Sequence, residues 1–321
     1  MRFLGFPVKN WLIMVAIGGI VYLILKFVVP SRVKEKYAGL FLLLPTIAWV
    51  ISFVAYPLIY AVRLSFFEWQ GIGNPNFVGF ANYTSAFQDY KFWNGWHVTG
   101  LFVGIAVSVE FFLGLGLAVL ANREIKGKGI IRTILTMPLF VSPLALGYLS
   151  FMLFYKDGPF TAMTSLLGMG KIGWLSDNKI ALYTIIGLDI WEWTPFCFLI
   201  LLAGLQMVPQ EMIEAAYLET NSSFKIFWHL VFPSLKPVVS IVLALRVIEA
   251  LKIFDLPFVL TYGGPGISTE SYSILVYKKA LKSFALGGGC AYSVIFLIVV
   301  MIVFSLVVSY TKLGDILTGG I

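Results

Sequence analysis

Long runs of apolar residues are the feature that most restricts how this chain can fold. A helix that crosses a membrane core about 30 Å thick needs about 20 predominantly apolar residues. Seven stretches of the sequence meet that requirement, at about 10–29, 38–62, 98–121, 133–154, 180–204, 238–260 and 288–310. Charged residues make up 12% of the chain, against about 25% in soluble domains. The sequence therefore predicts an all-α integral membrane protein, built as a polytopic helical bundle.

The first apolar stretch has two interpretations. Arg2 and Lys9 precede it, as basic residues precede the apolar region of a signal peptide. Its apolar part is long, however, and no A-x-A cleavage site follows. We therefore expect a retained extra span with a basic link over residues 1–37, followed by a core domain over residues 38–321.

Several kinds of chemistry have no signature in the sequence. Cys197 and Cys290 both lie in apolar runs, and the two histidines, His97 and His229, belong to no cluster with metal-ligand spacing. No GxxxxGK[ST] phosphate loop occurs, so we do not expect the chain to hydrolyse ATP. The net charge of +7 is explained by basic residues that flank membrane spans, and we expect neither a bound metal nor a nucleic-acid partner.

Residues 204–237 form a stretch with a different pattern. Pro209 and the acidic residues Glu211 and Glu214 are typical of a helix N-terminus. The sequence from Thr220 to Ser223 breaks that helix, and Ser222 or Ser223 can cap a second short one. We predict two short helices at a membrane face, with the rival interpretation of an ordinary interfacial helix-loop-helix.

Four charged residues recur every third position within the stretch 238–260. They are Arg246, Glu249, Lys252 and Asp255. An unpaired charge at the bilayer centre costs about 2.5–3.5 kcal/mol, so these side chains must pair, face the bundle interior or line water. One interpretation is a hydrated substrate path that also includes Phe254; the other is ion pairing of Arg246 with Glu249 and of Lys252 with Asp255.

The stretch 180–204 carries a second polar and aromatic group, Trp191, Glu192 and Trp193. Aromatic faces together with hydrogen-bonding side chains suit a sugar, whereas a tryptophan belt at the membrane boundary is the alternative. For Glu110 and Asp189 we favour contacts between helices. We also expect close packing at Gly100 and Gly104 and at Gly114 and Ala118.

Four motifs occur in order along the chain. Residues 76–83 resemble an FVG-x-x-NY signature, and residues 114–138 resemble a GLxxAxLxN…G…R…P block. Glu214, Ala215 and Ala216, with the break near residue 220, resemble an EAA loop. Residues 260–265 resemble an LT-x-GGP motif, whose outer turn contains Thr261, Gly263, Gly264 and Pro265. Together the four motifs resemble those of permease subunits of binding-protein-dependent ABC importers.

The resemblance is to the carbohydrate-uptake type, as in maltose and glycerol-3-phosphate importer permeases. It implies the type I importer permease fold, here with six core spans and one extra N-terminal span in the cytoplasmic membrane. It implies that residues 204–237 form the coupling loop, in which Glu214, Ala215, Ala216, Tyr217, Thr220 and Asn221 contact an ATPase subunit. The family usually has Gly where this chain has Thr220; Asn221 can adopt a left-handed conformation and preserve the turn.

The same resemblance implies the partners: a second homologous permease, a dimer of ATPase subunits that binds ATP and Mg²⁺, and an external solute-binding protein. The basic cluster at 123–132 favours the cytoplasmic side, which places 204–237 there also. The expected function is alternating-access import of a sugar or oligosaccharide. Glycerol phosphate, alginate-type solutes and polyamines are alternatives, as are a secondary transporter with protons on Glu110, Asp189 or Asp255, and a non-transporting membrane scaffold.

Overall fold

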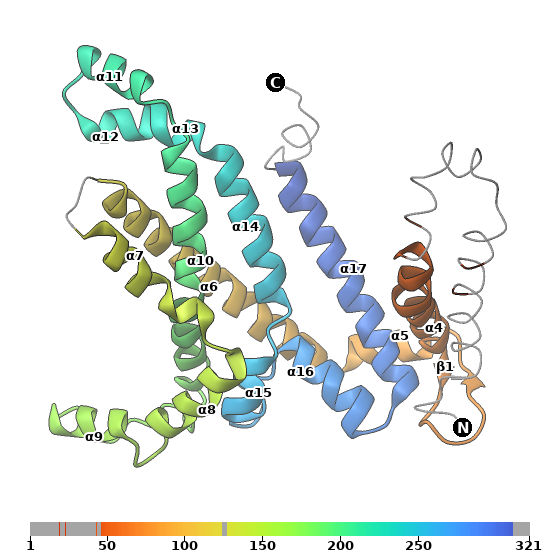
Figure 1. Ribbon diagram of the computed structural model, residues 1–321. Coiled ribbons are helices and arrows are strands. Elements are labelled where there is room, and N and C mark those ends of the chain that lie inside the picture. The colour runs from red at the N-terminus through yellow and green to blue at the C-terminus, as the bar shows by residue number, and fades with distance from the viewer. Residues whose placement is uncertain (1–18, 20–22, 24–42, 44–45, 124–126, 311–321) are drawn as a thin grey trace, which may run out of the picture. The chain divides into compact units, whose positions relative to one another are not determined.

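The computed structural model describes residues 19, 23, 43, 46–123 and 127–310 (Figure 1). Within them, four helices are long and apolar enough to cross a membrane: Thr46–Leu64, Tyr90–Ala121, Ala181–Gln206 and Leu286–Ser309. A bent pair, Lys128–Phe140 with Pro143–Leu166, would make a fifth. The predicted spans near 98–121, 180–204 and 288–310 are thus confirmed as helices, as is the part of the span near 38–62 that begins at residue 46. Of the predicted span at 10–29, the structure describes only residues 19 and 23.

The chain divides into two compact units, which are described separately. The first unit comprises residues 1–89 and 276–295. Its described elements are η1 (Ile51–Ala55), α4 (Tyr56–Leu64), β1 (Phe67–Glu68), β2 (Asn76–Phe77), α5 (Ala81–Gln88), η4 (Lys278–Lys282) and the beginning of α17 (Leu286–Tyr310). After α4, the strands β1 and β2 form an antiparallel hairpin with Phe67 opposite Phe77, and α5 follows it. This hairpin departs from a purely all-α fold.

The second unit comprises residues 90–275 and 296–321, and it contains most of the helical core. Its elements up to the middle of the chain are α6 (Tyr90–Ala121), α7 (Lys128–Thr136), η2 (Met137–Phe140), α8 (Pro143–Phe154), α9 (Pro159–Leu166) and α10 (Ala181–Gln206). Those that follow are α11 (Gln210–Glu219), α12 (Ser223–Ile226), η3 (Phe227–Val231), α13 (Phe232–Ser234), α14 (Lys236–Leu251), α15 (Asp255–Thr261) and α16 (Tyr272–Tyr277).

Two predicted spans are broken helices. The stretch 133–154 bends by 91° between η2 and α8, where Pro138 and Pro143 remove backbone donors and end the regular helix, as expected from its two prolines. The stretch 238–260 was predicted as one continuous span, and this is wrong. α14 ends at Leu251, and α15 begins at Asp255 after an irregular turn.

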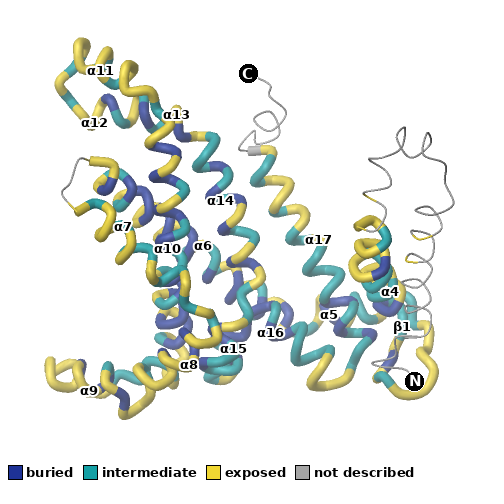
Figure 2. The backbone as a smooth tube through the Cα atoms, viewed as in Figure 1, coloured by how far each residue is buried: buried dark blue, intermediate teal, exposed yellow. Residues whose placement is uncertain are grey.

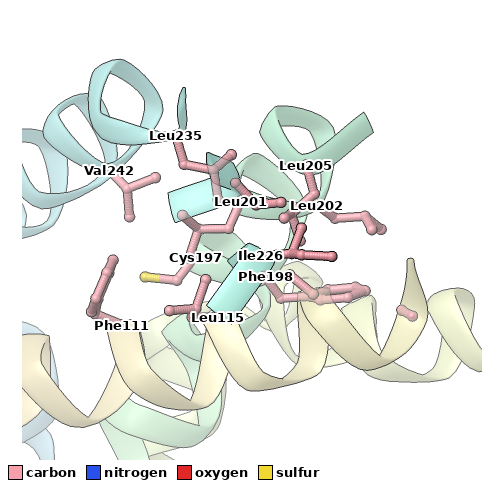
Figure 3. Packing of buried hydrophobic residues seen from close by; sticks show 13 residues of the cluster. Phe111, Leu115, Cys197, Phe198, Leu201, Leu202, Leu205, Ile226, Leu235 and Val242 are labelled. Carbon is pink, nitrogen blue, oxygen red and sulfur yellow. The ribbon is translucent and has the colours of Figure 1, made fainter. Parts of the chain in front are cut away.

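Two apolar clusters hold the second unit together along α6 and α10. One lies toward the C-terminal ends of both helices and includes Phe111, Leu115, Phe198 and Leu201 (Figure 3). The other lies toward their N-terminal ends and includes Phe102 and Ile185, which are almost completely buried. Burial of such side chains stabilises each by about 1.5–3 kcal/mol.

Only one of the two predicted small-residue contacts brings helices together. A Cβ atom on Gly114 would lie 2.6 Å from Cβ of Cys197 on α10, so glycine is required for this close approach. At Gly100 and Gly104 a Cβ would meet nothing within 4 Å among the described residues. The expectation of close packing is therefore confirmed at Gly114, whereas no described residue of this chain packs closely against Gly100 and Gly104.

Candidate functional site: a buried ion cluster beside a polar cavity

An arginine in the middle of the second unit binds carboxylates from two other helices. Nε of Arg246 on α14 donates to Oε2 of Glu110 on α6 at 2.5 Å, and Nη2 donates to Oε1 of the same carboxylate at 2.8 Å. Nη2 also donates to Oδ2 of Asp189 on α10, at 2.9 Å. All three side chains are almost fully buried, with exposed fractions of 2%, 0% and 3% for Arg246, Glu110 and Asp189.

This ion cluster lies between the two apolar clusters. On α6, Glu110 lies between Val107 of the N-terminal cluster and Phe111 of the C-terminal cluster. On α10, Asp189 comes three residues after Ile186 of the N-terminal cluster. Buried carboxylates and guanidinium groups are tolerated only when each has partners of the opposite charge. The helix-contact roles favoured for Glu110 and Asp189 are thus confirmed, and Arg246 is the residue they contact.

The alternative interpretation, ion pairing within the stretch 238–260, is wrong. Arg246 pairs with Glu110 and Asp189 instead of Glu249, because a buried guanidinium needs partners in the bundle interior. Lys252 pairs with Glu249, with Nζ and Oε1 2.8 Å apart, instead of with Asp255. The turn between α14 and α15 separates Lys252 from the helix that carries Asp255, so the four charges do not form one stripe.

A polar cavity of about 120 Å³ adjoins the ion cluster. Its lining residues come from α8, α10, α14, α15 and the turn between the last two; they are Pro143, Asp189, Glu192, Trp193, Arg246, Glu249, Ala250, Lys252, Ile253, Phe254, Asp255 and Leu256. Every residue of the predicted substrate path except Trp191 therefore lies around one cavity. Trp191 is 50% exposed and is absent from this lining.

Trp193 is held against the ion cluster. The guanidinium carbon of Arg246 lies 4.5 Å from the centroid of the Trp193 ring, which is cation–π geometry. Phe196 packs against the same ring in a T-shaped arrangement, with centroids 5.8 Å apart. The orientation of Trp193 at the cavity is thus fixed from two sides. Contact of any of these lining residues with a solute remains a prediction.

The stretch 204–237 forms the predicted pair of short helices. α11 begins directly after Pro209, and the hydroxyl of Ser222 accepts a hydrogen bond from the backbone N–H of Lys225 at the start of α12. α11 and α12 lie beyond one end of α10, whereas α9 lies near its other end (Figure 1). Most residues of α11 are exposed, including Glu214, Ala215 and Tyr217 (Figure 2).

The break between the two helices is made differently from the prediction. Asn221 is not left-handed; among the described non-glycine residues only Tyr262 and Phe284 have a positive φ. Thr220 is extended, with φ of −153° and ψ of 137°, and its hydroxyl accepts a hydrogen bond from the backbone N–H of Ser222 at 3.3 Å. A threonine side chain thus closes this turn.

A groove of about 790 Å³ lies between the 204–237 stretch and the C-terminal end of α6. Asn122 and Arg123 line it together with Tyr217, Phe224 and Trp228. Arg123, the first residue of the basic cluster, therefore lies at the same end of the unit as α11 and α12, as expected from the sequence. Leu218 and Phe224 add exposed apolar surface there, at 91% and 72% exposure.

The Gly-Gly-Pro turn follows α15 and is closed by Thr269, which the sequence did not single out. The hydroxyls of Thr261 and Thr269 lie 2.6 Å apart, and that of Thr269 donates to the carbonyl of Gly264 at 2.7 Å. Gly263 has a φ of 85°, and the Gly264–Pro265 peptide bond is cis. The turn is thus a compact structure around a fully buried threonine.

Comparisons with known proteins agree with this architecture. Residues 110–312 match the family model described as the binding-protein-dependent transport system inner membrane component. The chain is 34% identical over 286 residues to the trehalose/maltose transport system permease protein MalF of Thermococcus litoralis, covering 88% of this chain and 95% of the relative. It is 31% identical over 280 residues to the trehalose transport system permease protein SugA of Mycobacterium tuberculosis, covering 83% and 85%.

The fold is also similar to a solved structure. A chain of a bacterial ABC transporter involved in the import of the acidic polysaccharide alginate superimposes with a TM-score of 0.78 at 19% identity. The superposition covers 88% of this chain and 97% of that chain. The matched family region begins at Glu110 and includes the ion cluster, the cavity and the 204–237 stretch. The chain thus belongs to the binding-protein-dependent transport system inner membrane components, as a multi-pass inner-membrane permease subunit of an ABC importer.

Proposed function

We propose that this permease passes a sugar or oligosaccharide across the cytoplasmic membrane. The observation that carries this proposal is the similarity, over more than four-fifths of the chain, to relatives named as trehalose and maltose permeases. The cavity supports it, because an oriented indole and several carboxylates offer stacking and hydrogen bonds to a polyhydroxylated solute. ATP and Mg²⁺ would bind the partner ATPase subunits and not this chain.

The cavity volume of about 120 Å³ is well below the roughly 300–1,000 Å³ that is typical of ligand pockets. A second homologous permease subunit would supply the remaining walls of the site. An external solute-binding protein would deliver the solute, and the surrounding membrane lipid would cover the apolar outer faces. The Arg246 cluster would then act as a fixed support for Trp193 and not as a direct ligand of the solute.

The proposed coupling surface consists of Glu214, Ala215, Ala216 and Tyr217 on α11, with the turn at Thr220 and Asn221. These residues lie on a short helix that projects beyond the bundle core and carries exposed apolar neighbours. ATP-driven closure of the ATPase subunits would move α11 and reorient the spans. A polyamine is the second candidate solute, because four carboxyl groups line the cavity.

The deciding experiment is uptake into proteoliposomes that contain this chain, its partner permease, its ATPase subunits and its binding protein. We expect ATP-dependent accumulation of trehalose or maltose, and none of spermidine or glycerol 3-phosphate. Uptake driven by a proton gradient without ATP would instead support a secondary transporter.

A further inference from the structure

The cavity beside Trp193 contains more acidic than basic groups. Its ionisable lining residues are Asp189, Glu192, Arg246, Glu249, Lys252 and Asp255. Four carboxyl groups therefore face two cationic groups. Glu110 is not a lining residue, but its carboxylate binds Arg246 and adds a further negative charge next to the cavity.

Both cationic groups already form ion pairs with carboxylates. Arg246 donates to Glu110 and Asp189, and the ring of Trp193 covers its guanidinium group. Lys252 donates to Glu249 at 2.8 Å. An anionic group that entered the cavity would therefore meet cations whose charge is already compensated, together with the further carboxyl groups of Glu192 and Asp255. The attraction that it gains would not offset the repulsion and the hydration that it loses.

Among the described carboxyl groups of the lining, Glu192 is the buried one without a hydrogen-bond donor. Its residue surface is 3% exposed, and it belongs to the cavity lining. No described residue forms a hydrogen bond or salt bridge with its side chain. A buried carboxyl group is costly unless a donor satisfies it. Hydroxyl or ammonium groups of a solute are donors of the required kind, whereas a carboxylate or phosphate is not.

We propose that this cavity selects solutes by charge, with Glu192 as the specificity-determining residue. It accepts polyhydroxylated solutes that are neutral or carry an amine, and it rejects those that carry a carboxylate, phosphate or sulfonate. This inference rests on the proposed function of the cavity as the solute site. Selection arises from repulsion and lost hydration of the wrong solute as much as from contacts to the right one. It would distinguish this chain from the alginate importer, whose cargo is acidic.

The test uses the whole transporter in lipid nanodiscs, without the binding protein, so that only the membrane site contributes to selection. Binding of three trehalose forms of nearly equal size is measured by competition: trehalose, its 6-amino-6-deoxy derivative and its 6-carboxylate. We expect the amine to bind at least as tightly as trehalose and the carboxylate at least about tenfold more weakly, which corresponds to about 1.4 kcal/mol. In Glu192→Gln, the ratio between the amine and the carboxylate should fall by about tenfold.

Each outcome decides a separate claim. Equal binding of trehalose and its carboxylate by the wild type would overturn charge selection and leave the sugar function intact. If trehalose, its derivatives and maltose all fail to bind, the result contradicts the proposed function and, with it, this inference. Asp255→Asn is a second variant at the exposed side of the cavity, in case Glu192→Gln does not fold. It should also lower the ratio between binding of the amine and binding of the carboxylate. An unchanged ratio in both variants would contradict the proposal.

Discussion

Arg246 and Glu110 are 136 residues apart in the chain, and two parallel hydrogen bonds join them in the interior of the second unit. This bidentate geometry fixes α14 against α6, and the added bond to Asp189 fixes α10 to the same point. Two of the helices that line the cavity, α10 and α14, are thus joined to each other and to α6 by one guanidinium group.

Arg246→Met should strongly destabilise the protein. Removal of one member of a buried ion cluster leaves uncompensated carboxylates and costs about 3–5 kcal/mol. The thermal unfolding temperature of the detergent-solubilised transporter measures this effect. Lys252→Met is the matched control, because its pair with Glu249 is about half exposed and worth about 0–1 kcal/mol. Equal losses in the two variants would contradict the structural role of the cluster.

Gly114→Ala should disturb the contact between α6 and α10. Its new Cβ would overlap Cβ of Cys197 and the backbone of Phe198, and such overpacking costs about 1–3 kcal/mol. Gly104→Ala adds the same methyl group to the same helix, where nothing described lies within 4 Å. We expect a lower unfolding temperature for Gly114→Ala alone. A similar decrease in both would contradict the packing argument, because alanine has a higher helix propensity than glycine and would not by itself lower stability.

Glu214→Lys should uncouple ATP hydrolysis from transport. The side chain is exposed on α11, so charge reversal should leave folding unchanged while weakening the contact with the ATPase subunit. Solute uptake and ATPase activity in proteoliposomes are measured together. Glu219→Lys is the control on the same helix, five residues further on and therefore on a different face. Normal uptake by Glu214→Lys would remove the coupling assignment.

Thr269→Val should loosen the Gly-Gly-Pro turn. The substitution keeps the shape of the side chain but removes the hydroxyl that bonds Thr261 and the carbonyl of Gly264. The carbonyl of Gly264 loses its donor, whereas the hydroxyl of Thr261 keeps its bond to the carbonyl of Pro257, so we expect a loss of about 0.5–1.5 kcal/mol. Thr269→Ser retains the hydroxyl and should retain most of the stability. An unfolding temperature that falls equally in both variants would show that the methyl group, and not the hydrogen bonds, is what matters.

Local residue patterns in the sequence determined where most of the helices lie and to which family the chain belongs. Apolar length determined where the long helices lie, because a helix satisfies its own backbone in lipid and needs only a fixed number of apolar residues. Pro209, the break after Glu219 and the Ser222 cap determined α11 and α12 for similarly local reasons. The motifs from residue 76 to residue 265 were sufficient to indicate the permease family.

Only the tertiary structure decided which charges pair. The spacing of Arg246, Glu249, Lys252 and Asp255 suggested partners within one helix, but the partners of Arg246 come from α6 and α10. The cause is that a buried guanidinium takes the carboxylates that surround it in space, and their distance along the sequence carries no information about this. The break after Leu251, the exclusion of Trp191 from the cavity and the unpaired Glu192 likewise depend on how separate helices meet.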